Sequence, residues 1–140
     1  MFRRVLVDTD VILDLLLGRR PFYPSASRLF VAFQEGHIEG HVSSLAFSNL
    51  FYLLRKEEGG GPGAIAILRK LRLVTRVLMV DEKIIDLALA STFTDFEDAI
   101  QYFAAAEWEL DAIVTRNRRD YKASKIAIVS AEECLELAGL

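Results

Sequence analysis

A short apolar run followed by aspartates, close to the N-terminus, constrains the fold more than any other stretch of the chain. Val5-Leu6-Val7 is the pattern of a strand that is buried on both faces of its sheet. Asp8 follows, at the carboxyl end of a central strand, where ligand sites of open α/β sheets lie. Asp10 predicts an N-cap for a helix that begins at Val11. An aspartate after a strand is more often a turn or cap residue than a catalyst, so later segments must decide the role of Asp8.

Strand-like and helix-like segments alternate along the rest of the chain. Short β-rich or apolar runs predict strands over 37–42, 74–80, 112–115 and 126–129. Helix starts are predicted between them: Ser43 or Ser44 for a helix to about Glu58, Asp81, and the capping-box pairs Thr94 with Glu97 and Ser130 with Glu133. Glycines at 59–61 and 63 predict a flexible connection between two helices. This alternation predicts an α/β fold with a mostly parallel sheet.

Length and composition limit the classes of protein that remain. The 140 residues are expected to form one domain, over residues 1–140, and 52% apolar residues exclude disorder. A net charge of −3 argues against bulk attraction to nucleic acid but leaves room for a local basic patch. The single cysteine, Cys134, indicates a reducing compartment, and no apolar run nears the roughly 20 residues of a membrane span. We therefore expect a cytoplasmic protein.

Polar residues follow two of the predicted strands and open one helix. Asp8 follows the first strand, Asp98 lies in the first turn of the helix that starts near residue 94, and Thr115, Asn117 and Asp120 follow the strand at 112–115. Because parallel strands end at the same edge of a sheet, these groups are expected to converge. Two negative charges about 4 Å apart repel by roughly 4 kcal/mol at an effective dielectric of about 20, so three carboxylates need a counter-charge. Mg²⁺ or Mn²⁺ would supply it, and such a site suits phosphodiester hydrolysis.

Four stretches of the sequence resemble the PIN-domain ribonucleases, the fold of VapC-type toxins in bacterial toxin–antitoxin pairs. They are 5–14 (VLVDTDVILD), 42–51 (VSSLAFSNLF), 95–101 (DFEDAIQ) and 113–121 (IVTRNRRDY). The resemblance implies a three-layer α/β/α fold with a mostly parallel sheet of about five strands. It also implies metal-dependent cleavage of single-stranded or structured RNA, leaving a 5′-phosphate and a 3′-hydroxyl. A homodimer is common in the family, and an antitoxin protein would be the partner.

The resemblance carries residue roles over by position. Asp8 and Asp98 would be catalytic metal ligands for Mg²⁺ or Mn²⁺. Asp120 would be a third acidic ligand, direct or through water, with Asn117 beside it. Thr115 would orient a ligand or a water.

One position departs from the family pattern. Many members have Glu where this chain has Asn49, so the loss of a carboxylate is expected to weaken cation binding, above all for a second metal ion, unless Asp10, Asp14 or Glu97 compensates for it. Four basic residues of the loop after 112–115 are either phosphate-binding or simply solvated: Arg116, Arg118, Arg119 and Lys122.

Plainer interpretations stand beside several of these roles. Glu97 fits a capping partner of Thr94 better than a metal ligand. Asp14 is expected to be solvated or paired with Arg19 or Arg20, and Asn49 to hydrogen-bond within a polar pocket if it has no metal role. The two histidines that flank the strand at 37–42, His37 and His41, are expected at the surface.

Three functions therefore compete at this stage. The first is a metal-dependent endoribonuclease, as the toxin of a toxin–antitoxin pair. The second is a PIN-fold protein that binds RNA or a partner with weakened or no catalysis, because of Asn49. The third is a phosphatase of the haloacid-dehalogenase type, since Asp8-Thr9-Asp10 also resembles the nucleophile motif of that class.

Overall fold

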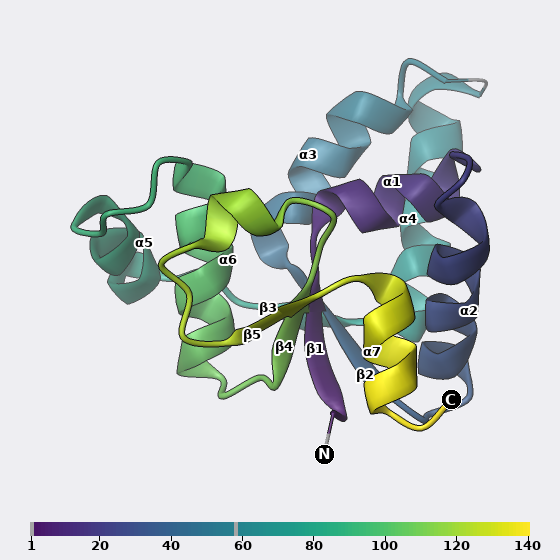
Figure 1. The fold of residues 1–140 in the computed structure, drawn as a ribbon. Coiled ribbons are helices and arrows are strands. Elements are labelled where there is room, and N and C mark those ends of the chain that lie inside the picture. Colours follow the sequence, from purple (N-terminus) through teal and green to yellow (C-terminus); the bar gives the residue numbers. More distant parts are fainter. Residues whose placement is uncertain (1, 58) are drawn as a thin grey trace.

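A parallel sheet lies between two layers of helices in the computed structural model, which describes residues 2–57 and 59–140 (Figure 1). The strands are β1 (Arg4–Val7), β2 (Glu39–Ser43), β3 (Arg76–Leu78), β4 (Ala112–Val114) and β5 (Ala127–Val129). The helices are α1 (Thr9–Leu16), α2 (Tyr23–Gln34), α3 (Ser44–Leu54), α4 (Gly60–Val74), α5 (Glu82–Leu89), α6 (Phe96–Glu107) and α7 (Ala131–Leu137), with the 3₁₀ helix η1 (Arg118–Tyr121).

The sheet has β1 at its centre, as the apolar run predicted. Across the described residues its order is β3-β2-β1-β4-β5 and every pairing is parallel. Val5 pairs with Gly40 on one side and with Ala112 on the other. The strand order runs outward in opposite directions from β1, so β1 and β4 flank a topological switch point. The α/β/α prediction is confirmed, with an all-parallel sheet.

Alternating side chains of β1 supply two separate cores. Val5 and Val7 pack into the core shared with α1, α2, α3, α4 and α7. Leu6 points to the opposite face and packs with Ile113 in the core formed by α5 and α6. Because each face is apolar, the chain must cover both with helices, and this fixes the three layers seen in Figure 1.

Helix α2 approaches β2 closely at one glycine. The ring of Phe33 occupies the space that a Cβ at Gly40 would need, so a larger residue there would force the helix away from the sheet. This contact anchors the layer that carries α2 beside the centre of the sheet.

Two helix starts differ from their predicted positions. The N-cap of α1 is Asp8, whose Oδ1 accepts from the backbone N–H of Thr9 at 2.7 Å, so the prediction of Asp10 as the cap is wrong. The N-cap of α6 is Asp95, which accepts from the N–H of Asp98, so the capping box between Thr94 and Glu97 is also wrong. A neighbouring aspartate with extended backbone competes successfully with the predicted cap in both places.

The glycine-rich stretch is helical where a flexible connection was predicted. Helix α4 begins at Gly60, and its N-cap Gly59 has a φ of +94°, a conformation that favours glycine. Pro62 lies in the first turn, where a missing N–H breaks no helical hydrogen bond. Helix α3 ends at Leu54, and its predicted end at Glu58 falls outside the described residues. The predicted caps Ser43, Asp81 and Ser130 are all confirmed.

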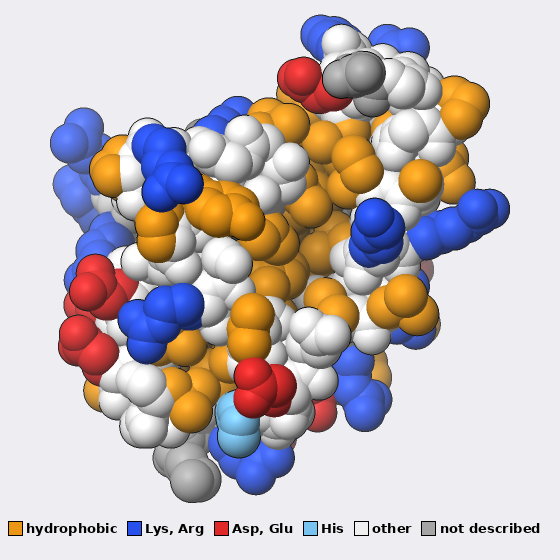
Figure 2. All heavy atoms as spheres, turned by 90° about the vertical axis from the view of Figure 1, so that its right-hand side faces the viewer, with side chains coloured by type: hydrophobic (Ala, Val, Ile, Leu, Met, Phe, Trp, Pro, Cys, Tyr) orange, Lys and Arg blue, Asp and Glu red, His pale blue; other side chains and the backbone are white. Residues whose placement is uncertain are grey.

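The two histidines differ in burial. His41 is buried in β2, so its prediction as a surface residue is wrong, whereas His37 is exposed. Figure 2 shows hydrophobic side chains gathered in a hollow on the side of the molecule that carries α2 and α4. Over the described residues, no helix combines the length and apolar character that crossing a membrane would require.

Candidate active site

Asp8 lies buried at the carboxyl edge of the sheet, at the switch point between β1 and β4. Its backbone N–H continues the β1–β4 ladder by donating to the carbonyl of Val114 at 2.9 Å. Its Oδ2 accepts from the hydroxyl of Thr115 at 2.8 Å, and its Oδ1 accepts from the Gln101 amide at 3.0 Å. The strand end therefore sets the position of the carboxylate, and two side chains from other elements fix its plane.

Asp98 reaches the same point from the first turn of α6. The hydroxyl of Tyr121 lies between the two carboxylates, 3.3 Å from Asp8 Oδ2 and 3.2 Å from Asp98 Oδ1. That hydroxyl has one proton, so it donates to one carboxylate at a time, and it accepts from Gln101 Nε2 at 2.8 Å. Residues that are about 90 positions apart in the sequence thus form one buried hydrogen-bonded cluster.

The cluster contains more negative charge than its surroundings neutralise. Burial, followed by the charges of Asp8, Asp95 and Asp120, raises the pKa of Asp98 to about 7, although the Tyr121 hydrogen bond lowers it. Burial and the two carboxylates also raise the pKa of Tyr121, so the phenol stays protonated. Among the described residues, neither Asp8 nor Asp98 forms an ion pair.

A second acidic group borders the cluster and is neutralised. Asp14 is 1% exposed, and its two oxygens accept from Arg116 Nε at 2.7 Å and Nη2 at 3.0 Å. The guanidinium also stacks over the ring of Phe22 at 3.9 Å. The backbone N–H of Arg116 donates to Asp10 Oδ2 at 2.9 Å, which ties the loop after β4 to α1. Asp14 pairs with Arg116, so the predicted pairing with Arg19 or Arg20 is wrong.

The remaining predicted site residues lie around this centre. Asp120 is half-buried in η1 and is near enough for its charge to act on Asp98. Asn117 is exposed, and its backbone N–H donates to the Thr115 hydroxyl at 3.0 Å. Within the described residues, no group of three or more Asp, Glu, His or Cys side chains is arranged tightly enough to hold a metal ion. The structure therefore unites Asp8 with Asp98 and leaves Asp120 at the border.

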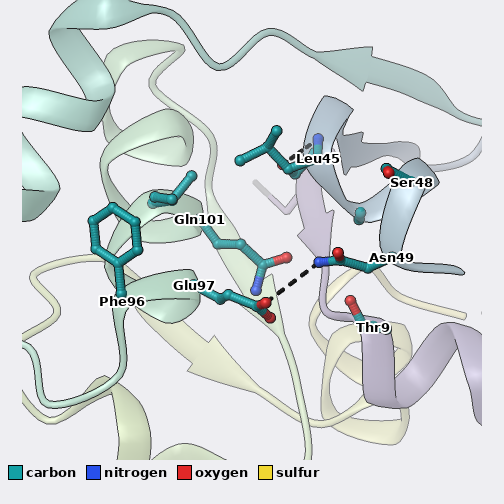
Figure 3. A pocket seen from close by; sticks show the side chains of 10 residues that line it. Thr9, Leu45, Ser48, Asn49, Phe96, Glu97 and Gln101 are labelled. Atoms are coloured by element: carbon teal, nitrogen blue, oxygen red, sulfur yellow. Dashed lines mark hydrogen bonds between the residues drawn. The ribbon is translucent and has the colours of Figure 1, made fainter. Parts of the chain in front are cut away.

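Asn49 and Glu97 face each other across the opening beside the cluster. Asn49 Nδ2 donates to Glu97 Oε1 at 3.4 Å, linking α3 to α6 (Figure 3). Both residues line the same cavity, together with Thr9, Ser48 and Gln101. Asn49 thus hydrogen-bonds within a polar pocket, as expected for this residue if it has no metal role.

The predicted basic residues are not equivalent in the structure. Arg116 is paired with Asp14, and Arg118 forms an ion pair with Glu133 of α7. Arg119 and Lys122 are exposed, and neither forms an ion pair within residues 2–57 and 59–140. Of the four predicted basic residues, Arg119 and Lys122 are therefore the two without an ion-pair partner in the described part of the chain.

Sequence reasoning missed two central residues, Gln101 and Tyr121. Both were quoted as parts of motifs, but neither was given a role. Gln101 lies one turn after Asp98 on α6, and that spacing puts both side chains on the same helix face. Tyr121 directly follows Asp120 in a short polar loop, and nothing in that local pattern indicated that its hydroxyl would reach Asp8.

Comparison with known proteins adds a family and a set of similar folds. A family model described as PIN domain matches residues 4–119. No curated protein matches the sequence.

Several solved structures share the fold. A toxin–antitoxin complex from Klebsiella pneumoniae has 19% identity and a TM-score of 0.68, covering 91% of this chain and 97% of the other. VapBC-1 from nontypeable Haemophilus influenzae has 14% identity and a TM-score of 0.70, with coverage of 92% and 98%. VapC20 from Mycobacterium tuberculosis, described as a toxin that cleaves the sarcin–ricin loop, has 18% identity and a TM-score of 0.61, with coverage of 78% and 86%.

Proposed function

The chain belongs to the PIN-domain family, and on that premise we propose that it is a metal-dependent endoribonuclease with Asp8 and Asp98 at its catalytic centre. The observation that carries the proposal is a pair of buried carboxylates at a topological switch point that share the Tyr121 hydroxyl. Such uncompensated charge is costly to a fold and concentrates at functional sites. Membership of this family also leaves the haloacid-dehalogenase alternative without support.

The donor set fits a hard divalent cation. Burial, followed by the charge of Asp8, raises the pKa of Asp98 to about 7, and a positive charge between the two carboxylates would favour their ionised forms. Asp8 and Asp98 would hold Mg²⁺ or Mn²⁺, with Asp120 as a third ligand, directly or through water. The bound ion would lower the pKa of a water and offset charge that develops on the phosphate.

Neighbouring side chains of the protein orient the acidic pair. Gln101 and Thr115 each bind one oxygen of Asp8, which holds the carboxylate plane fixed. Asn117 supports Thr115 through its backbone N–H, at the start of the loop that carries Asp120. Arg119 and Lys122, whose charges are uncompensated, would bind phosphates of the RNA backbone.

Cleavage of RNA by the purified protein tests the proposal. Single-stranded RNA should be cut with Mn²⁺ and spared with EDTA, and Asp8→Asn or Asp98→Asn should lower the rate by at least about 100-fold, since even residues that only support metal ligands cost 10–100-fold. Asp86→Asn makes the same chemical change on the exposed side of α5 and should cut like wild type. Equal rates for all three variants would refute the assignment.

The non-catalytic alternative rests on Asn49, which supplies no negative charge. Its signature would be measurable RNA binding without Mn²⁺ uptake at millimolar concentrations in a calorimeter. The nuclease proposal requires Mn²⁺ uptake that is lost in Asp8→Asn.

We also propose that residues 1–140 form one PIN-like domain that binds an antitoxin protein and assembles as a homodimer. Large hydrophobic side chains are exposed on α3 and α4, among them Tyr52, Leu53 and Leu73, and exposed apolar surface often marks protein interfaces. Light scattering during gel filtration tests the dimer. Co-expression with a small neighbouring gene product, where one is encoded, tests the antitoxin.

A further inference from the structure

A cavity opens beside the acidic pair, between α6 and the start of α3. Its volume is about 260 Å³, below the roughly 300–1,000 Å³ of sites for drug-sized ligands, so it suits one small group of one ring or two fused rings. Its walls include Thr9, Ser48, Asn49, Glu97 and Gln101, with Phe96 at the side (Figure 3). Gln101 joins this cavity to the catalytic centre, because the same side chain donates to Asp8.

The orientation of the Gln101 amide follows from its partners. Its Nε2 donates to Asp8 Oδ1 and to the Tyr121 hydroxyl, so the nitrogen must face the acidic pair and the oxygen must face away from it. Gln101 is 6% exposed, and its Oε1 has no hydrogen-bond partner among the described residues. In Figure 3 this oxygen points toward Asn49. A buried acceptor without a donor costs free energy unless a ligand or water supplies one.

The polar groups around that oxygen form a defined pattern. Glu97 contributes a carboxylate that accepts from Asn49 Nδ2 at 3.4 Å, a long hydrogen bond that a better donor could replace. Asn49 Nδ2 is the amide donor beside these two acceptors, the Thr9 and Ser48 hydroxyls also line the cavity, and Phe96 is an aromatic ring that is 45% exposed at the rim. An aromatic ring for stacking and polar groups for the base edge are the means by which proteins recognise unstacked RNA bases.

We propose that this cavity binds a guanine base of the RNA next to the scissile phosphate. The proposal rests on the proposed nuclease function and names the base that the site recognises. Guanine presents N1–H and N2–H₂ as adjacent donors, which match Glu97 and Gln101 Oε1, and its O6 accepts from Asn49. Uracil offers one N–H between two carbonyls and would leave an acceptor of the protein without a donor.

Binding of mononucleotides in EDTA tests the cavity separately from catalysis. By calorimetry, 5′-GMP should bind with a Kd at least tenfold below that of 5′-UMP, and 5′-IMP, which lacks the 2-amino group, should lie between them. Equal Kd values for GMP and UMP, or no binding of GMP, would overturn the proposal. GMP selectivity in a protein that cuts no RNA would refute the nuclease function and leave the base site standing. RNA cleavage without any preference for guanine would refute only the base site.

Two variants identify the groups involved. Glu97→Gln should raise the Kd of GMP about tenfold and change that of UMP less than twofold, because it replaces the charged acceptor for N1–H with the weaker carbonyl oxygen of a neutral amide. Phe96→Leu should weaken both nucleotides to a similar degree, since stacking does not depend on the base. Glu136→Gln, on an exposed position of α7, is the matched control and should bind like wild type. An unchanged GMP affinity in Glu97→Gln would exclude guanine recognition by this carboxylate.

Discussion

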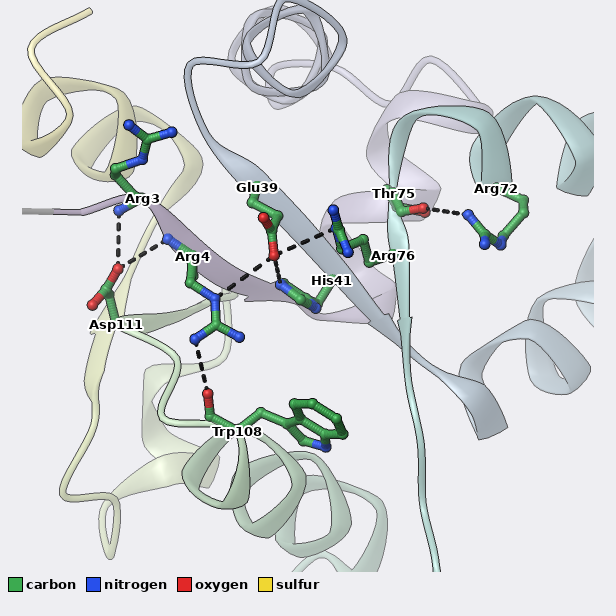
Figure 4. Close-up of polar contacts among 9 residues, drawn as sticks. All are labelled: Arg3, Arg4, Glu39, His41, Arg72, Thr75, Arg76, Trp108 and Asp111. Carbon is green, nitrogen blue, oxygen red and sulfur yellow. Dashed lines mark hydrogen bonds and ion pairs between the residues drawn. The ribbon is translucent and has the colours of Figure 1, made fainter.

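The carboxylates at the two edges of the sheet differ in their burial and in their cationic partners. At the amino edge, Glu39 lies among Arg4 at 3.6 Å, Arg76 at 3.5 Å and the His41 ring at 2.9 Å (Figure 4). Asp111 accepts from the backbone N–H groups of Arg3 and Arg4, both at 2.9 Å. Glu39 therefore has cationic partners, and Asp111 is exposed and has two backbone N–H donors.

At the carboxyl edge, Asp8 and Asp98 are buried and have no cationic partner among the described residues. Asp8 accepts from Thr9 N–H, Thr115 and Gln101, the Tyr121 hydroxyl lies between Asp8 and Asp98, and burial raises the pKa of Asp98 to about 7. Asp14, a few residues away, shows that the same region can neutralise an acid, since Arg116 pairs with it. The uncompensated pair is therefore a local property of the switch point, and it is the place where the proposed cation would bind.

The largest effect on stability should come from breaking the neutralised pair at the carboxyl edge. Arg116→Ala leaves Asp14 buried without its cation and should lower the free energy of unfolding by about 3 kcal/mol, the lower end for buried pairs because Arg116 is 32% exposed. Urea denaturation measures it. Arg119→Ala, exposed in the same loop, should change stability by less than about 0.5 kcal/mol. Similar values for the two variants would show that Asp14 needs no partner.

A smaller effect should follow from removing the hydroxyl between the acids. Tyr121→Phe takes a buried hydrogen bond from the cluster and should cost about 1–2 kcal/mol in urea denaturation. Because that hydrogen bond lowers the pKa of Asp98 in the metal-free protein, its loss should raise this pKa further in EDTA, which NMR titration of the carboxyl measures. An unchanged pKa would exclude Tyr121 as a group that tunes Asp98. Tyr102→Phe is the matched control, because the Tyr102 hydroxyl accepts from Lys125 N–H and lies outside the acidic pair's hydrogen bonds.

The smallest effect on stability should come from neutralising one carboxylate at each edge, Asp98 at the carboxyl edge and Glu39 at the amino edge. The pKa of Asp98 lies above its unfolded value of 3.8, so this group's contribution to stability is full below about pH 4 and is lost as pH rises through about 7. In EDTA, Asp98→Asn should therefore stabilise the protein at pH 8, on the order of 1 kcal/mol, and do so less at pH 5. Glu39→Gln should destabilise by about 1 kcal/mol or less, since its ion pairs are partly exposed. Thermal melts at both pH values measure the difference, and a loss of stability in Asp98→Asn at pH 8 would contradict it.

Local patterns in the sequence were sufficient for the architecture. The apolar run at β1, the alternation of strands with helices, and the caps Ser43, Asp81 and Ser130 follow from burial and backbone hydrogen bonding within a few residues. These are short-range effects, which explains why the prediction of an α/β fold with a mostly parallel sheet was correct, whereas the three layers were implied by the family resemblance. Where two capping residues compete nearby, as Asp8 with Asp10 or Thr94 with Asp95, the same patterns failed.

The sequence alone determined that acids would follow the central strands and which family the four motifs resemble. Only the tertiary structure decided which acids are neutralised. Arg116 could have bound RNA or stayed solvated, and the fold pairs it with Asp14. Gln101 and Tyr121 join Asp8 to Asp98 because α6 and η1 converge on the end of β1. Charge compensation depends on distances between segments far apart in the chain, and no local pattern specifies those distances.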